Sequence, residues 1–118
     1  MSVLNFTLSD ISEALNEIVE NGQHGCEIVR IGVFGSVARG EAEAESDLDF
    51  IIGYQRQNSS DSDIILDVFK KRIEFETTLR GEFSPIKLSI VSEDAVNEGM
   101  NENFADDVYR DVVWIYEQ

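Results

Sequence analysis

The chain has 118 residues, of which 42% are apolar, and it carries a formal net charge of −15. This length fits one domain over residues 1–118 with a small core. The negative charge repels phosphate backbones, which argues against bulk nucleic-acid binding. No apolar segment reaches the roughly 18 residues that a membrane helix needs. The single cysteine, Cys26, excludes an internal disulfide and fits a cytoplasmic location.

Helices and strands are expected to alternate along the chain. Apolar residues at helical spacing predict a first helix that starts near Thr7 and stops at Asn21-Gly22. Runs of β-branched and aromatic residues predict the strands. The expected order is helix 8–21, strand 27–34, strand 47–53, helix 61–80, strand 86–91, helix 92–100 and helix 101–116.

The longest expected helix starts at a cap on Asp61 or Ser62 and ends at Gly81. A run of cations, Lys70-Lys71-Arg72, lies within it. Such a run is usually a solvated face, but this is the only basic cluster in an acidic chain, so it could also meet an acidic strip on a partner or a phosphate. The apolar face of this helix is expected to consist of Ile64, Ile65, Val68, Phe69, Ile73 and Leu79.

The final helix is expected to run through Tyr116 and to bury one stripe of apolar side chains. The residues at helical spacing are Phe104, Val108, Val112, Ile115 and Tyr116.

One stretch carries the candidate chemistry. An apolar run ends in Gly35-Ser36, and a second apolar run opens with Asp47 and Asp49. The period of two in a strand places both carboxylates on one face, about 5–7 Å apart. At an effective dielectric of about 20, their repulsion is about 2–3 kcal/mol. A divalent cation such as Mg²⁺, which prefers carboxylate and phosphate oxygens, would relieve that repulsion.

Gly35 and Ser36 supply the phosphate side of the same candidate site. Glycine allows a sharp turn and a close approach to a ligand, and backbone N–H groups that follow Ser36 can point at an anion. Arg39 adds a guanidinium within reach of a phosphate. A Gly-Ser pair alone is most often a turn, and an Asp-x-Asp alone is most often a solvated strand start. Their combination favours a pocket for a metal-bound nucleotide.

These residues resemble the signature of a known family. Gly35-Ser36, ten intervening residues and then Asp47-Leu48-Asp49 look like the minimal nucleotidyltransferases (MNT), a branch of the polymerase-beta-type superfamily. The longer family pattern is Phe-Gly-Ser-x-Ala-Arg-Gly-Glu-Ala followed by Ser-Asp-x-Asp. It is matched by Phe34–Ala42 and by Ser46–Asp49.

The resemblance implies an α/β (α+β) nucleotidyltransferase fold, with a small mixed β-sheet of three or more strands packed by helices. It implies that ATP is bound by Gly35, Ser36, Arg39 and Ser46. It also implies that Asp47 and Asp49 are the catalytic residues and hold Mg²⁺.

The family chemistry is transfer of a nucleoside monophosphate from a nucleoside triphosphate to an acceptor hydroxyl, with loss of pyrophosphate. Small members are often antitoxins of a helical HEPN ribonuclease toxin. The resemblance therefore implies an adenylyltransferase that modifies a HEPN-type partner. A small-molecule acceptor is a weaker alternative, because 118 residues leave no room for a domain that would bind it.

The chain departs from the family pattern at one position. A third carboxylate usually lies on the next core strand, where this chain has Ser89. A hydroxyl is a poor Mg²⁺ ligand and a poor base. Glu93 and Asp94 lie just beyond that strand and could substitute only after a loop rearrangement. The alternative function is therefore a catalytically weak or inactive protein of the same fold. It would neutralise its partner by binding, in a homo- or hetero-oligomer.

Overall fold

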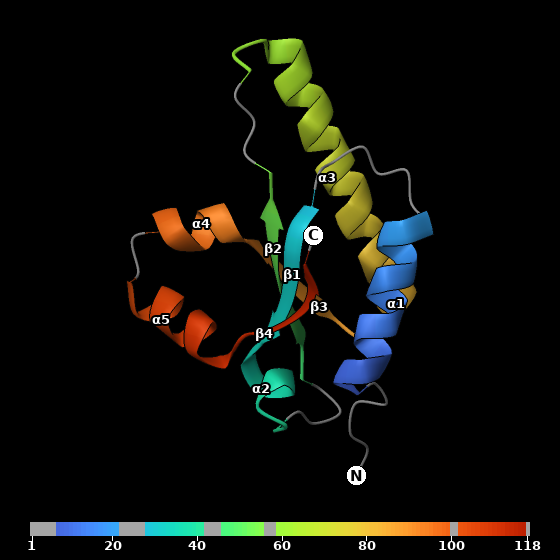
Figure 1. Ribbon diagram of the computed structural model, residues 1–118, viewed down its shortest axis with the longest axis vertical. Coiled ribbons are helices and arrows are strands. Elements are labelled where there is room, and N and C mark those ends of the chain that lie inside the picture. Colours follow the sequence, from blue (N-terminus) through green and yellow to red (C-terminus); the bar gives the residue numbers. More distant parts are fainter. Residues whose placement is uncertain (1–6, 22–27, 42–45, 56–58, 100–101, 118) are drawn as a thin grey trace.

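The computed structural model describes residues 7–21, 28–41, 46–55, 59–99 and 102–117, so Cys26 lies outside the described residues. The strands form a four-stranded mixed sheet in the order β3-β2-β1-β4, with β1 antiparallel to β2 and β4, and β3 parallel to β2. This confirms the mixed sheet packed by helices (Figure 1). The elements are α1 Leu8–Asn21, β1 Ile28–Phe34, α2 Gly35–Ala38, β2 Leu48–Tyr54, α3 Ser62–Phe83, β3 Leu88–Ser92, α4 Glu93–Glu98, α5 Glu102–Asp111 and β4 Val113–Glu117.

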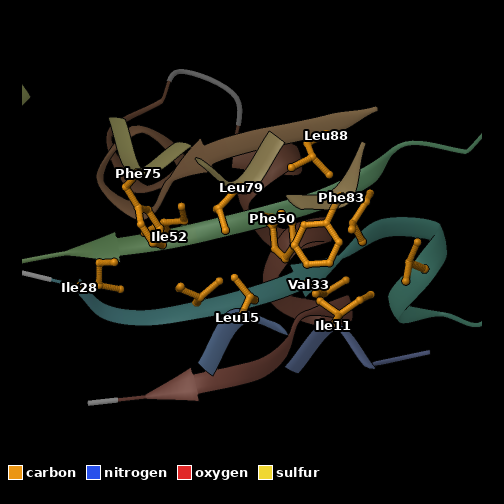
Figure 2. Close-up of a cluster of buried hydrophobic side chains, with 13 residues drawn as sticks. Ile11, Leu15, Ile28, Val33, Phe50, Ile52, Phe75, Leu79, Phe83 and Leu88 are labelled. Atoms are coloured by element: carbon orange, nitrogen blue, oxygen red, sulfur yellow. The ribbon is translucent and has the colours of Figure 1, made fainter. Parts of the chain in front are cut away.

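Helices cover both faces of the sheet, with α1 and α3 on one side and α4 and α5 on the other (Figure 1). On the first face, Phe50 and Ile52 of β2 pack with Leu15 of α1 and Leu79 of α3 (Figure 2). On the second face, Ile51 packs in a smaller cluster with helix residues of α4 and α5. The central strands are therefore buried on both sides, which accounts for the nearly continuous apolar run in β2.

The first predicted helix is confirmed. It is α1, in which Ile11 and Leu15 are fully buried. Its start is capped, because the Thr7 hydroxyl accepts from the Asp10 N–H at 3.1 Å and the Asp10 carboxylate accepts from the Thr7 N–H at 3.1 Å.

The prediction that the last helix continues to Tyr116 is wrong. Helix α5 ends at Asp111, and residues Val113–Glu117 form β4. This strand pairs with β1, where Trp114 lies opposite Gly32 and Tyr116 opposite Ile31. Otherwise β1 would have an unpaired edge, and a run of valine, tryptophan, isoleucine and tyrosine has high strand propensity. Helical spacing in that segment was a coincidence.

The prediction that Gly81 ends the long helix is also wrong. Helix α3 continues to Phe83, whose side chain is fully buried and lies 5.7 Å from Phe50 between ring centroids. Burying a phenylalanine contributes about 1.5–3 kcal/mol, which exceeds the roughly 1 kcal/mol that a glycine costs inside a helix.

The buried face predicted for α3 is largely wrong as well. Its fully buried residues are Phe75, Leu79 and Phe83, all in its second half. Four residues predicted to be buried are instead exposed: Ile64, Ile65, Phe69 and Ile73. The reason is visible in Figure 1, where the first half of α3 extends past the end of the sheet.

Candidate functional site

The turn between β1 and α2 places the backbone of Gly35 against Asp49. Phe34, the last residue of β1, lies opposite Asp49 in the antiparallel register. Gly35 follows with a φ of +73°, which side chains disfavour. A Cβ atom built on Gly35 would overlap Oδ2 of Asp49 and would lie 3.2 Å from its Cγ. The backbone angle therefore favours glycine at this position, and a side chain here would force the Asp49 carboxylate to move.

The structure brings the two predicted acids together. Strand β2 begins one residue later than predicted, so Asp47 is exposed just before the strand, whereas Asp49 is half-buried within it. Burial raises the pKa of the Asp49 carboxyl above its ordinary value of 3.8, the Asp47 carboxylate raises it further, and the Arg39 guanidinium lowers it in part. Asp47 and Asp49 are two positions apart along the chain, and Arg39 lies at the end of α2, the helix that begins at Gly35.

Ser89 lies on the strand next to Asp49. Strand β3 runs parallel to β2, and the register pairs Ser89 with Asp49. Adjacent strands are about 4.8 Å apart, so a carboxylate at position 89 would stand beside that of Asp49. The strand itself starts at Leu88 rather than at Ile86 as predicted. That Ser89 takes the place of a family carboxylate stays a prediction.

Glu93 is held by other partners. Its carboxylate accepts from the Arg30 guanidinium, with Nε at 3.1 Å, and from the Tyr109 hydroxyl at 2.9 Å. It lies over Gly53, because a Cβ there would be 2.6 Å from Glu93 Oε1. Gly53 and Asp49 are four positions apart on β2, or about 13 Å. In this arrangement Glu93 cannot act as the third acid.

Arg39 pairs with two carboxylates at the edge of the site. Its Nε donates to Glu41 at 2.9 Å and its Nη1 donates to Asp111 at 2.8 Å. The hydrogen bonds to Glu41 and Asp111 raise the pKa of the guanidinium. Asp111 is the last residue of α5, and its side chain is only 14% exposed. Asp111 could not be identified from the sequence, because it is 72 residues from Arg39 and belongs to no motif.

The remaining predicted nucleotide ligands flank this cluster. Ser36 lies on α2, a single turn that Val37 anchors in the core. That helix ends at Ala38, and Gly40 follows its C-cap residue Arg39 with a φ of +73°. Ser46 is partly buried just before Asp47. Predictions about the segment between them, residues 42–45, lie outside the described residues.

The donor set fits a divalent cation. Asp47 and Asp49 are two positions apart at the start of β2, and a cation between two such carboxylates removes their repulsion. Two carboxylates with further oxygens from phosphate and water suit Mg²⁺. Among the residues that the structure describes, there is no group of three or more His, Cys, Asp or Glu side chains arranged to hold a metal.

The family model for the polymerase beta nucleotidyltransferases matches residues 13–118. The chain belongs to this family, which confirms the resemblance that rests on Gly35-Ser36 and Asp47-x-Asp49. No curated protein matches the sequence significantly. The described helices include none that is long and apolar enough to cross a membrane.

Solved structures share the fold. One described as a minimal nucleotidyltransferase is 28% identical, with a TM-score of 0.59 over 92% of this chain and 96% of its own. A toxin–antitoxin complex with AMP-PNP is 13% identical, with a TM-score of 0.57 over 90% of this chain and 72% of its own. A tri-AMPylated Shewanella oneidensis HEPN toxin in complex with an MNT antitoxin is 9% identical, with a TM-score of 0.50 over 95% of this chain and 74% of the matched one.

Proposed function

We propose that this chain is an MNT-type nucleotidyltransferase that transfers AMP from Mg-ATP to a hydroxyl of a helical HEPN-type toxin. It would act as the antitoxin of that partner in the cytoplasm. The observation that carries the proposal is the contact of Gly35 with Asp49, because it joins the Gly-Ser turn to the acid pair. The two toxin–antitoxin structures support the nucleotide and the partner only through a shared fold.

Each predicted site residue has a role in the proposal. Asp47 and Asp49 would hold Mg²⁺, which would stabilise charge on the attacking and leaving oxygens. Gly35 and Ser36 would bind the triphosphate through the turn, and Ser46 would add a hydroxyl near Asp47. Arg39 would balance phosphate charge, because it already lies close enough to lower the pKa of Asp49.

The proposed step is an in-line displacement at the α-phosphorus of ATP. The oxygen of the acceptor hydroxyl forms a bond to this phosphorus, and the bond from the α-phosphorus to the oxygen that bridges to the β-phosphorus breaks. Pyrophosphate leaves with that electron pair. The hydroxyl proton passes to solvent water, because Ser89 offers no carboxylate beside Asp49. The missing base would make the reaction slow.

A second candidate function follows from the same feature. With a hydroxyl at Ser89 in place of an acid, the chain could retain nucleotide binding and neutralise its partner by masking it. The half-buried Asp49 and the glycine turn would then be a binding site without efficient transfer.

Labelled ATP distinguishes the two functions. The chain is incubated with α-labelled ATP, Mg²⁺ and a HEPN-type toxin, and label on that toxin is measured together with its ribonuclease activity. Transfer that disappears in Asp47→Asn supports the enzyme. Equal neutralisation by wild type and Asp47→Asn, with no label on the partner, supports the masking protein. An absence of both label and neutralisation would reject the antitoxin proposal.

A further inference from the structure

Asp111 is fixed in place by the fold on both sides. It is the last residue of α5, and β4 begins two residues later at Val113. The buried Val108 anchors the helix before it, and Val113 pairs with Val33 of β1 after it. Figure 1 shows the end of α5 next to α2. The backbone of Asp111 is therefore tied to the same strand that leads into Gly35.

The surroundings of Asp111 disfavour a carboxylate, apart from Arg39. The C-terminal end of a helix carries partial negative charge and favours cations, and the whole chain has a net charge of −15. The Asp111 side chain is also only 14% exposed. Arg39 Nη1 donates to its Oδ2 at 2.8 Å, whereas Arg110 Nε lies 3.7 Å from Oδ1, beyond hydrogen-bond distance. The ion pair with Arg39 is therefore the contact that offsets these costs.

The two carboxylates on Arg39 differ in how firmly they are held. Glu41 follows α2 and its side chain is 65% exposed, whereas Asp111 is nearly enclosed. Ion pairs of exposed side chains contribute little and are screened by salt. A triphosphate carries more charge than a carboxylate, so it would replace the exposed partner first. The geometry therefore separates a fixed partner, Asp111, from an exchangeable one, Glu41.

Arg39 belongs to the same turn as the candidate nucleotide ligands. It caps the C-terminal end of α2, whose first residue is Gly35, and Gly35 contacts Asp49. Its guanidinium also lowers the pKa of the Asp49 carboxyl in part. The hydrogen bonds to Glu41 and Asp111 use two of its five N–H donors, and a guanidinium matches phosphate oxygens in pairs. An arginine that is already held loses less side-chain freedom when an anion binds.

We propose that Asp111 is the positioning residue of Arg39. It holds the guanidinium ready for the triphosphate of the nucleotide, and a phosphate oxygen then takes the place of Glu41 on Nε. This inference rests on the proposed function, in which Arg39 binds the triphosphate of Mg-ATP. Asp111 makes no bond to the nucleotide in this arrangement, so its whole effect on binding passes through Arg39.

The sign of the effect distinguishes this role from overall charge. Removal of an acid from a chain with a net charge of −15 favours binding of an anion. Asp107 is the matched control, because it lies on the same helix, is 62% exposed and accepts from Arg110 at 2.7 Å. Asp107→Ala is expected to bind Mg-ATP as tightly as wild type or slightly more tightly. Asp111→Ala removes the same charge but is expected to bind about tenfold more weakly, or by about 1.4 kcal/mol.

Titration calorimetry with Mg-ATP and no acceptor protein measures these affinities. Glu41→Ala is expected to tighten binding about twofold to fivefold, because it removes one exposed ion pair that competes with the phosphate. In an Arg39→Ala background, Asp111→Ala is expected to cause no further loss, because the two residues act as one unit. Asp111→Asn keeps the shape of the side chain and a weaker acceptor for Nη1, so its affinity is expected to lie between those of wild type and Asp111→Ala. It replaces Asp111→Ala in these comparisons if circular dichroism shows the alanine variant to be unfolded.

The outcomes separate the inference from the proposed function. Failure of the wild type to bind Mg-ATP would overturn both. Wild-type binding, with Asp111→Ala as tight as Asp107→Ala, would overturn the inference and leave the proposed function standing. An equal loss from Asp111→Ala with and without Arg39 would show that Asp111 only supports the fold, and weaker binding by Glu41→Ala would overturn the exchange.

Discussion

The α-carbon of Gly35 lies against the carboxylate of Asp49, so a side chain at position 35 would overlap that carboxylate. The contact joins the end of β1 to the start of β2, and the pairing of Phe34 with Asp49 holds it in register. The Gly-Ser turn and the acid pair are thus one structural unit. A substitution in the turn will displace the acid.

Gly35→Ala and Gly40→Ala form a matched pair, because both glycines have a φ of +73°. A Cβ on Gly40 meets no atom within 4 Å, whereas one on Gly35 overlaps Asp49. Gly40→Ala should therefore cost only the backbone penalty of about 1–2 kcal/mol. Gly35→Ala should cost at least about 1 kcal/mol more and abolish Mg-ATP binding. Urea unfolding and calorimetry measure the two effects, and equal losses in both variants would contradict the contact.

Asp49 should destabilise the metal-free protein as the pH rises. Its pKa is higher in the folded state than the ordinary 3.8, so the folded chain binds this proton more tightly than the unfolded chain. The associated stability is present below about pH 3.8 and is lost as the pH rises through the folded pKa. The free energy of unfolding of wild type relative to Asp49→Asn should therefore fall between pH 3.8 and 7.

Urea unfolding of both proteins at several pH values, in EDTA, measures this difference. Mg²⁺ should restore part of the stability of wild type at pH 7 and have little effect on Asp49→Asn. A pH-independent difference between the two proteins would show that burial and Asp47 do not perturb Asp49.

The parts of the candidate site could be proposed from the sequence because they are close along the chain. Gly35-Ser36 follows the end of β1, and Asp47-x-Asp49 lies at the start of β2. Because β1 and β2 are adjacent in the sheet, the short segment that connects them brings the two motifs together. Asp111 could not be found in this way, since it reaches Arg39 only when α5 packs across the second face of the sheet. The family resemblance placed Ser89 on the next core strand, whereas its register opposite Asp49 comes from the structure alone.

The errors in the fold occur where tertiary contacts overrule local pattern. The spacing of Val108, Val112 and Ile115 agreed with a helix. Residues 113–117 instead form a strand that pairs with the edge of β1. The apolar residues of α3 predicted a long buried face, yet the sheet covers only its second half. The periodicity of one segment does not show whether a sheet edge is available for pairing. It also does not show how far the sheet extends along a helix.

Ser89→Asp should increase adenylyl transfer. The new carboxylate would lie on β3 beside Asp49, where it could bind metal and accept the proton of the acceptor hydroxyl. General bases contribute about 10²–10⁴-fold, so a gain of at least tenfold is expected in labelled transfer with Mg²⁺. Ser89→Asn is the neutral control and should show no gain. Unchanged transfer in Ser89→Asp would mean that position 89 does not face the reacting groups.

Glu93 should support folding at the end of β2 that lies away from the site. Its hydrogen bond with Arg30 is the main cause that lowers the pKa of Glu93 below its ordinary 4.5, and the Tyr109 hydroxyl adds to the effect. Its side chain is 17% exposed, and Arg30 also lies 3.8 Å from the ring centroid of Trp114 on β4. Removal of the charge leaves Arg30 under-paired in a partly buried place, at a cost of about 1–3 kcal/mol.

The sign of the pH dependence follows from the lowered pKa. The contribution of Glu93 is present above pH 4.5 and is lost as the pH falls through the folded pKa. Glu93→Gln should therefore unfold at lower urea than wild type at pH 7, and the two proteins should converge in acid. Asp94→Asn is the control, because Asp94 is exposed on the same helix. A Glu93→Gln protein as stable as wild type at pH 7, with the same acid dependence, would show that the ion pair contributes nothing to the fold.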